Sequence, residues 1–236
     1  MNVYIMLIIA WGAGLMAVFG GFLAHVEGKA NTTVKKELVH GVTAFGGGIL
    51  LAAVAFALVP EGMKELNAWQ LTGLFAAGGV TFCFVDAWLQ KHEGNVSQFM
   101  AMILDFVPEA VSLGAVFTVN PKVGILLAIF IAAQNFPEGF NAYRELKSAK
   151  LATKTALIGL LGVSFFGPLS AIMGYCWLSN APQVTAMIMS FSAGGILYLV
   201  FQDIAPQAKM ERHWMPTLGA VLGFIIGMLS KQLLGQ

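Results

Sequence analysis

Two segments of the chain place acidic and amide side chains in the same short pattern, a polar residue followed by two residues and then Pro-Glu. The first segment runs from Asp105 to Glu109 and the second, 29 positions later, from Gln134 to Glu138. Residues four apart lie on one face of a helix, so each segment offers two oxygen-bearing side chains on one face. Such oxygens are ligands for divalent cations. The pattern therefore predicts metal-binding chemistry.

The two faces are expected to meet. Only a few residues join the two segments' helices, so the helices should be antiparallel neighbours. Counted from the same helix ends, Asp105 falls level with Glu138, and Glu109 falls level with Gln134. Four oxygen-bearing side chains can then converge between the two helices.

The prolines of both segments add backbone oxygens to this region. A proline inside a helix cannot bond the carbonyl four residues back, and its ring pushes that carbonyl aside. Leu104 and Ala133 thereby gain free carbonyl oxygens. Broken backbone at membrane depth is tolerated where it lines a cavity or an ion site.

The acids of this region have no basic partner in the sequence at the same depth. Asp105, Glu109 and Glu138 lie well inside apolar runs, with Asp86 and Asp203 nearer the run ends, and no Lys or Arg shares their depth. An ionised carboxylate there costs several kcal/mol unless it is compensated. A bound cation or protons must supply the compensation. Protonated acids that only join helices, and a proton relay without metal, are the alternatives.

The elements that position these residues are membrane-spanning helices. Of 236 residues, 58% are hydrophobic and only 11% are charged, and the net charge of +1 argues against a nucleic-acid partner. Runs of about twenty apolar residues recur, each long enough for a helix to cross the hydrocarbon layer. We predict an all-α membrane protein that forms one transmembrane domain over residues 1–236, with eight spans near 3–25, 41–60, 69–90, 98–119, 123–143, 154–178, 184–206 and 215–234.

The positive charges predict the orientation, because basic short loops stay in the cytoplasm. Three of the thirteen Lys and Arg residues, Lys64, Lys122 and Lys231, fall on the even-loop side. The other ten fall in or beside the odd-numbered loops: Lys29, Lys35, Lys36, Lys91, Arg144, Lys147, Lys150, Lys154, Lys209 and Arg212. Both termini should therefore lie outside the cytoplasm.

The second and seventh predicted spans contain similar short sequence segments. Residues 44–50 read Ala-Phe-Gly-Gly-Gly-Ile-Leu before Pro60, and residues 191–197 read Phe-Ser-Ala-Gly-Gly-Ile-Leu before Pro206. The two spans run in opposite directions in the predicted topology. An inverted repeat that relates spans one to three with spans six to eight follows, as in many transporters.

At these residues the chain resembles the ZIP (Zrt-, Irt-like) family of divalent-metal transporters, whose fourth and fifth spans carry His-Asn-x-Pro-Glu-Gly and Gln- or His-x-x-Pro-Glu motifs. Residues 134–139 match the second motif closely, residues 191–206 are similar to the family's seventh span, and residues 167–169 to its sixth. The resemblance implies eight spans in a 3+2+3 arrangement, extracytoplasmic termini, a metal site between spans four and five, and a homodimer in many members. It also implies an elevator-like movement of spans one, four, five and six.

The departures from the family pattern reduce the expected number of metal sites. Asp105 stands in place of the usual histidine, Phe106 in place of asparagine, Asn135 in place of an aspartate, and Gly167 in place of a glutamate. Family members with two metals use those altered positions for the second ion. We therefore expect one site, formed by Asp105, Glu109, Gln134 and Glu138.

A transport path is expected to continue from this site. Gln202 and Asp203 resemble the family's polar pair near the inner end of the seventh span, and Asn135 lies beside the site. The all-oxygen ligand set suits Mn²⁺ or Fe²⁺ as well as Zn²⁺, so it does not select one ion.

The function that we expect is transport of Zn²⁺, Fe²⁺ or Mn²⁺ by a multi-pass protein of the cell membrane, with uptake toward the cytoplasm implied by the family. The metal is then the substrate, and no cofactor is expected. An intramembrane enzyme is the rival class, yet the sequence contains no His-Glu-x-x-His, Gly-x-Ser-x-Gly or Gly-x-Gly-Asp motif. A passive channel and a metal sensor without transport use the same ligands and stay open.

Overall fold

The computed structural model describes residues 2–27, 32–92, 96–178, 180–211 and 213–234. Lys29 and Arg212, which enter the charge count, lie outside the described residues. The described chain is helical, with one isolated β-bridge between Met210 and His213. Its helices are α1 (Val3–Glu27), α2 (Thr33–Ala53), η1 (Val54–Leu58), α3 (Val59–Glu65), α4 (Ala68–His92), α5 (Ser97–Val119), α6 (Pro121–Ser148), α7 (Thr153–Ser164), α8 (Phe166–Met173), η2 (Gly174–Leu178), α9 (Pro182–Leu199), η3 (Val200–Ile204), α10 (Ala205–Ala208) and α11 (Leu218–Leu234).

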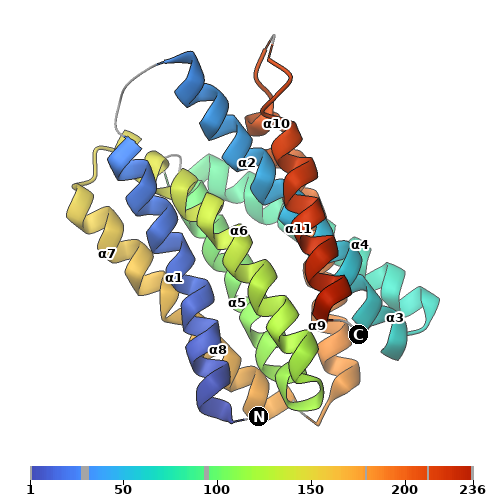
Figure 1. Ribbon diagram of the computed structural model, residues 1–236. Helices are drawn as coiled ribbons and strands as arrows, with labels where there is room; N and C mark the ends of the chain where they lie inside the picture. The colour runs from blue at the N-terminus through green and yellow to red at the C-terminus, as the bar shows by residue number, and fades with distance from the viewer. Residues whose placement is uncertain (1, 28–31, 93–95, 179, 212, 235–236) are drawn as a thin grey trace.

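Seven helical stretches within the described residues are long and apolar enough to cross a membrane. They fit the predicted all-α membrane protein. The eighth predicted span, 215–234, is a shorter apolar helix, because α11 begins only at Leu218, after Pro216. Figure 1 shows α1 beginning and α11 ending toward the same end of the bundle.

Two of the long helices continue through prolines at which the second and seventh spans were expected to end. The helical stretches reach Glu65 and Ala208, beyond Pro60 and Pro206. Each proline follows a π-helical turn, and the residue before it bonds five residues back: Val59 N–H to the Val54 carbonyl, and Ala205 N–H to the Val200 carbonyl. A π turn re-pairs the backbone where proline supplies no N–H, so the helix continues.

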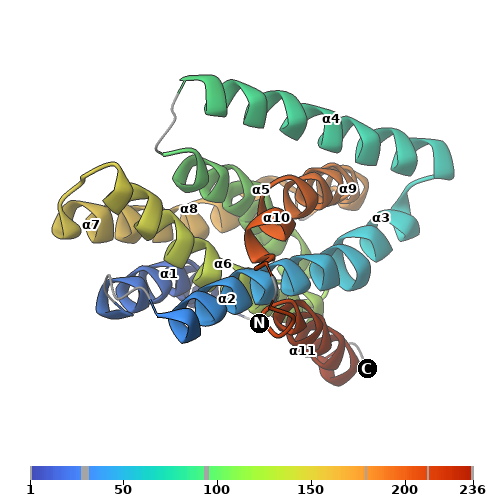
Figure 2. The ribbon, with the colours of Figure 1, turned by 90° about the horizontal axis from the view of Figure 1, so that it is seen from above.

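Seen from above, α5 and α6 lie in the middle of the bundle, and α4 runs along one edge (Figure 2). Helix α1 packs on α6, α8 packs on α5, α11 packs on α2, and α4 packs on α9. At each of these four crossings a glycine of either helix meets the partner's backbone: Gly20 and Gly139, Gly114 and Gly174, Gly48 and Gly219, Gly78 and Gly194. Small residues of this kind let membrane helices approach closely.

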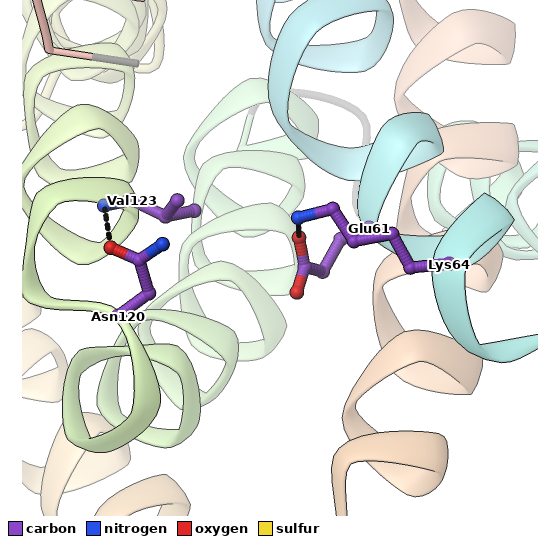
Figure 3. Close-up of polar contacts among 4 residues, drawn as sticks. All are labelled: Glu61, Lys64, Asn120 and Val123. Atoms are coloured by element: carbon purple, nitrogen blue, oxygen red, sulfur yellow. Dashed lines mark hydrogen bonds and ion pairs between the residues drawn. The ribbon is translucent and has the colours of Figure 1, made fainter. Parts of the chain in front are cut away.

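Two buried apolar clusters hold the bundle on either side of the α5/α6 pair. One joins α1, α5, α6, α7 and α8 around Phe106 and Leu160. The other joins α2, α5, α6 and α9 around Ile49, Phe130 and Ile196. The turn between α5 and α6 is fixed by Asn120, whose side-chain oxygen accepts from the Val123 N–H at 3.3 Å (Figure 3). This cap sets the register of the two central helices.

We expect Gly20→Ala to destabilise the protein by about 1–3 kcal/mol, because an added Cβ would overlap the Phe136 carbonyl of α6. Gly12→Ala in the same helix is the matched control, since a Cβ there meets no described atom within 4 Å. Thermal unfolding in detergent measures both variants. Equal melting temperatures would show that the α1/α6 crossing tolerates a wider separation.

Candidate metal site between α5 and α6

Helices α5 and α6 bring the two predicted segments side by side. Pro108 lies inside α5 and Pro137 inside α6, and neither proline ends its helix. Neither proline has an N–H, so the carbonyls of Leu104 and Ala133 lose their usual helical donors. Gly46 of α2 lies against the Pro137 ring, since an added Cβ would be 2.5 Å from its Cγ. The distorted part of α6 is thus packed closely by a second helix.

One half of the candidate site is a buried carboxylate and amide pair. Gln134 Nε2 donates to Glu109 Oε2 at 2.5 Å, so these two side chains lie level across the α5/α6 interface. Glu109 is 3% exposed and Gln134 is 1% exposed. The bond uses the amide nitrogen and leaves the amide oxygen, Gln134 Oε1, buried without a hydrogen-bond partner among the described residues.

The other half of the candidate site, which borders a cavity, holds Asp105 and Glu138. Asp105 is 5% exposed, and both side chains line one cavity of about 60 Å³. Asp105 Oδ1 and Glu138 Oε2 are buried and have no hydrogen-bond partner in the described part of the chain. Buried polar atoms without partners are rare in proteins, and each needs an explanation such as an ion. Oxygen atoms of this kind are suitable ligands for a divalent cation.

The cavity extends from these carboxylates toward the start of α5, the end of α6 and the segment that follows α9. The third, fifth and seventh predicted loops lie at these helix ends. Its lining contains three acids and, as far as the chain is described, no lysine, arginine or histidine. The lining residues are Gln98, Ala101, Met102, Asp105, Glu138, Asn141, Leu199, Asp203, Ile204 and Gln207. The cavity therefore gathers three carboxyl groups without a described base beside them, an arrangement that suits a cation when these groups are ionised.

The predicted path residues separate into three environments. Asp203 lines the cavity, whereas Gln202 is exposed and lines an apolar groove between α4 and α9. Asn135 faces α1, where its Nδ2 donates to the Ala13 carbonyl at 3.0 Å. Its Oδ1 is buried without a partner among the described residues. Only Asp203 of these three therefore lies where the cavity could pass an ion onward.

Three lining residues that sequence reasoning did not single out are Gln98, Asn141 and Gln207. Gln98 Nε2 donates to Gln207 Oε1 at 2.9 Å, which links α5 to α10 at the cavity wall. Asn141 Nδ2 donates to Thr43 of α2 at 3.3 Å. Asn141 follows Glu138 by three positions in α6, so helical spacing alone could have placed it on the same face.

The predicted acids do not gather at one point in this conformation. Among the described residues, no three His, Cys, Asp or Glu side chains form a group able to hold a metal ion. Glu109 is held by Gln134 at one level, and Asp105 with Glu138 borders the cavity at the next. Like charges in a buried interface repel one another, which favours this spread arrangement.

Comparison with known proteins gives one consistent result. The model of the family described as ZIP Zinc transporter matches residues 90–234. The chain is 24% identical to zinc transporter ZIP13 of Pongo abelii over 181 residues, which cover 70% of this chain and 52% of that protein. It is 24% identical to zinc transporter ZupT of Chlorobium limicola over 275 residues, 99% of this chain and 98% of that one.

A third similar protein is zinc transporter YKE4 of Saccharomyces cerevisiae, 21% identical over 208 residues that cover 82% of this chain and 58% of that protein. The chain thus spans about half of the length of the eukaryotic relatives ZIP13 and YKE4, and nearly all of the bacterial ZupT.

We expect divalent metal to raise the melting temperature of the wild-type protein, since a ligand at 100 times its Kd stabilises by about 2.7 kcal/mol. Asp105→Asn and Glu138→Gln should lose most of this shift, because each removes an unpartnered carboxylate oxygen. Without metal, neither variant should be less stable than the wild type. Thermal unfolding with Zn²⁺, Mn²⁺ and Fe²⁺ measures the shift.

The control variant is Glu61→Gln. Glu61 pairs with Lys64 at 2.7 Å at the end of α3, away from the cavity lining (Figure 3). It should keep the full metal shift. A full shift in Asp105→Asn and Glu138→Gln as well would contradict a metal site at these residues.

Proposed function

The chain belongs to the ZIP zinc transporter family, and from this premise we propose that it carries Zn²⁺, Fe²⁺ or Mn²⁺ across the cell membrane into the cytoplasm. The observation that carries the proposal is the set of buried oxygens on α5 and α6 that have no hydrogen-bond partner among the described residues, beside a cavity lined by three acids. The metal is the transported substrate in this proposal, and no resident cofactor takes part.

Each proposed ligand has a distinct role. Asp105 and Glu138 meet the ion at the cavity, because both line it and each has a free buried oxygen. Glu109 and Gln134 complete the site from the next level, where the free Gln134 Oε1 is available as a neutral ligand. These side chains lie at two levels in this conformation, so small side-chain movements must accompany binding. Three carboxylates around a divalent ion leave one excess negative charge at most, and this favours cation entry.

A single metal site is supported by the surroundings of Phe106. Its ring is 1% exposed and lies against Gly167 of α8, at which an added Cβ would be 2.7 Å from the ring's Cζ. On the other side the ring approaches Gly14 of α1. The apolar ring at one altered family position, Phe106, therefore fills the space beside another, Gly167. The Asn135 amide nitrogen is bonded to the Ala13 carbonyl.

We propose eight spans in a 3+2+3 arrangement, with α11 as the eighth and both termini extracytoplasmic. The inverted repeat would relate α1, α2 and α4 to α7 with α8, α9 and α11. One supporting feature is the pair of matching π turns before Pro60 and Pro206. A second is that helix contacts correspond under the repeat: the α1–α6 contact corresponds to the α8–α5 contact, and the α2–α11 contact to the α9–α4 contact. In this topology the cavity opens toward the cytoplasm.

The other side of the site is closed by packed apolar residues. Val116 of α5, Phe130 of α6 and Met189 of α9 belong to one buried cluster outward of Glu109 and Gln134. A site that is open on one side and sealed on the other is the arrangement of a carrier, in contrast to a channel with a continuous pore. This favours the carrier over a passive channel.

The remaining alternatives lack a specific observation in their favour. An intramembrane enzyme or a proton relay could use the same acids, and a sensor would bind metal without flux. The similar proteins are zinc transporters by name, which favours transport over catalysis. A homodimer stays an expectation from the family resemblance.

We expect saturable metal flux into proteoliposomes that contain the wild-type protein, with Zn²⁺, Fe²⁺ and Mn²⁺ offered in turn. Glu109→Gln and Glu138→Gln should lower the flux at least about tenfold, the effect of losing about 1.4 kcal/mol of ion binding. Glu61→Gln should transport like the wild type. Unchanged flux in both site variants, or no wild-type flux with any ion, would overturn the transport proposal; flux that does not saturate would indicate a channel.

Metal transport should weaken as the pH falls, because carboxylate ligands must be deprotonated to bind the ion and protons compete for the same oxygens. For each proton displaced on binding, the apparent affinity drops by up to about tenfold per pH unit below the range where the ligands titrate. Concentration dependence of flux at several pH values, with equal pH on both sides of the membrane, measures this effect. An affinity that is independent of pH would argue against carboxylate ligands.

A further inference from the structure

Two buried serine hydroxyls outside the proposed site have no explanation in the fold. Ser112 of α5 is 1% exposed and Ser192 of α9 is 2% exposed. The Oγ atom of each has no hydrogen-bond partner among the residues that the structure describes. Most serines inside membrane helices bond the carbonyl four residues back, as Ser190 does to Ala186 at 2.7 Å. An unpaired buried hydroxyl carries a desolvation cost, so we expect these two hydroxyls to have a functional role.

Ser112 lies on the same stripe of α5 as the proposed ligands. Asp105, Glu109, Ser112 and Val116 follow one another at intervals of four, three and four residues, which keeps them on one helix face. Along this stripe Ser112 comes directly after Glu109 in the direction away from the cavity. The carboxylates of the site are thus followed by a hydroxyl before the apolar residues begin.

Ser192 lies on the corresponding stripe of α9. Leu199 and Asp203 line the cavity with Asp105, and Ser192 is seven residues, about 10 Å, outward from Leu199. Ser112 is likewise seven residues outward from Asp105. Helices α5 and α9 pack against each other and run in opposite directions, so these equal steps bring the two hydroxyls to the same level.

The apolar residues one turn farther out agree with this register. Val116 follows Ser112 by four positions and Met189 precedes Ser192 by three, and both belong to the same buried cluster. The two serines therefore sit between the carboxylate site and the packed cluster that closes the outer side. Polar side chains without partners at that boundary are the feature that the packing of the bundle leaves unexplained.

We propose that Ser112 and Ser192 form an outer binding step for the transported divalent cation, which the ion occupies between the outer side and the carboxylate site. The inference rests on the proposed function. Neutral hydroxyl oxygens can replace water ligands of a divalent cation without adding charge, so they bind it weakly and let it pass on. In the present conformation the apolar cluster closes this step from the outside, and movement of α5 relative to α9 exposes it.

The test compares flux for Ser112→Ala, Ser192→Ala and the double variant in proteoliposomes over a range of Zn²⁺ or Mn²⁺ concentrations. Each single substitution should lower flux at low metal concentration by about three- to tenfold, the usual effect of losing one hydrogen-bond-strength contact. Ser112→Thr and Ser192→Thr keep the hydroxyl and should restore most of the flux. The melting temperature of the alanine variants should equal or exceed that of the wild type, because no hydrogen bond is lost.

Ser190→Ala is the matched control, since Ser190 is buried in the same helix but has its hydroxyl bonded to Ala186. Its flux should stay close to that of the wild type. Wild-type flux in both serine-to-alanine variants would overturn the outer step and leave the transport proposal intact. Equal losses in Ser190→Ala, or losses that follow a lower melting temperature, would assign the serines a packing role. Absence of wild-type flux would overturn the proposed function itself.

Discussion

Buried oxygen atoms on α5 and α6 that have no hydrogen-bond partner in the described part of the chain set the main physical demand on this structure. Asp105, Glu109 and Glu138 have negative charge to place at membrane depth, and the cavity beside them contributes a further acid, Asp203, but no described basic residue. Such a group of acids is costly in a low dielectric and stays folded only if the surrounding helices hold it firmly. In the proposed function, a bound divalent cation offsets that cost. Stability and ion recognition therefore depend on the same atoms.

Close helix crossings at glycines hold the helices in place. Helix α1 packs closely on the central helix α6, and α8 packs closely on the central helix α5. The α2–α11 and α4–α9 pairs, farther from the centre, have the same kind of glycine contact. Backbone-to-backbone packing fixes helix positions better than long flexible side chains can, because there is little rotamer freedom to adjust. The polar site can then stay incompletely paired without drawing the helices out of place. The Asn120 cap complements this by holding the α5/α6 register at the turn.

The sequence was informative where local rules dominate. The four-residue spacing of Asp105 with Glu109 and of Gln134 with Glu138, with a short turn between, predicted which side chains would be level, and the bond from Gln134 to Glu109 lies at that level. It was misleading where tertiary pairing dominates. The second and seventh spans were expected to end at Pro60 and Pro206, but a π turn before each proline let the helix continue. The different directions of Gln202 and Asp203, and the contact of Phe106 with Gly167, depend on helix rotation and long-range packing that spacing alone does not determine.

The π turn at Val200–Ile204 has a consequence for the phase of the helix that contains it. Leu199 and Gln207 both line the cavity although eight residues separate them. In an uninterrupted α-helix those side chains would point about 80° apart. The π turn contains one residue more than an α-helical turn, which reduces the difference to about 20°. The extra residue in the π turn rotates the following helical turn, so that Gln207 faces the same cavity as Leu199. Removing one residue from this segment would restore ideal winding and turn Gln207 away from the cavity, so a more regular helix would remove a polar side chain from the cavity wall.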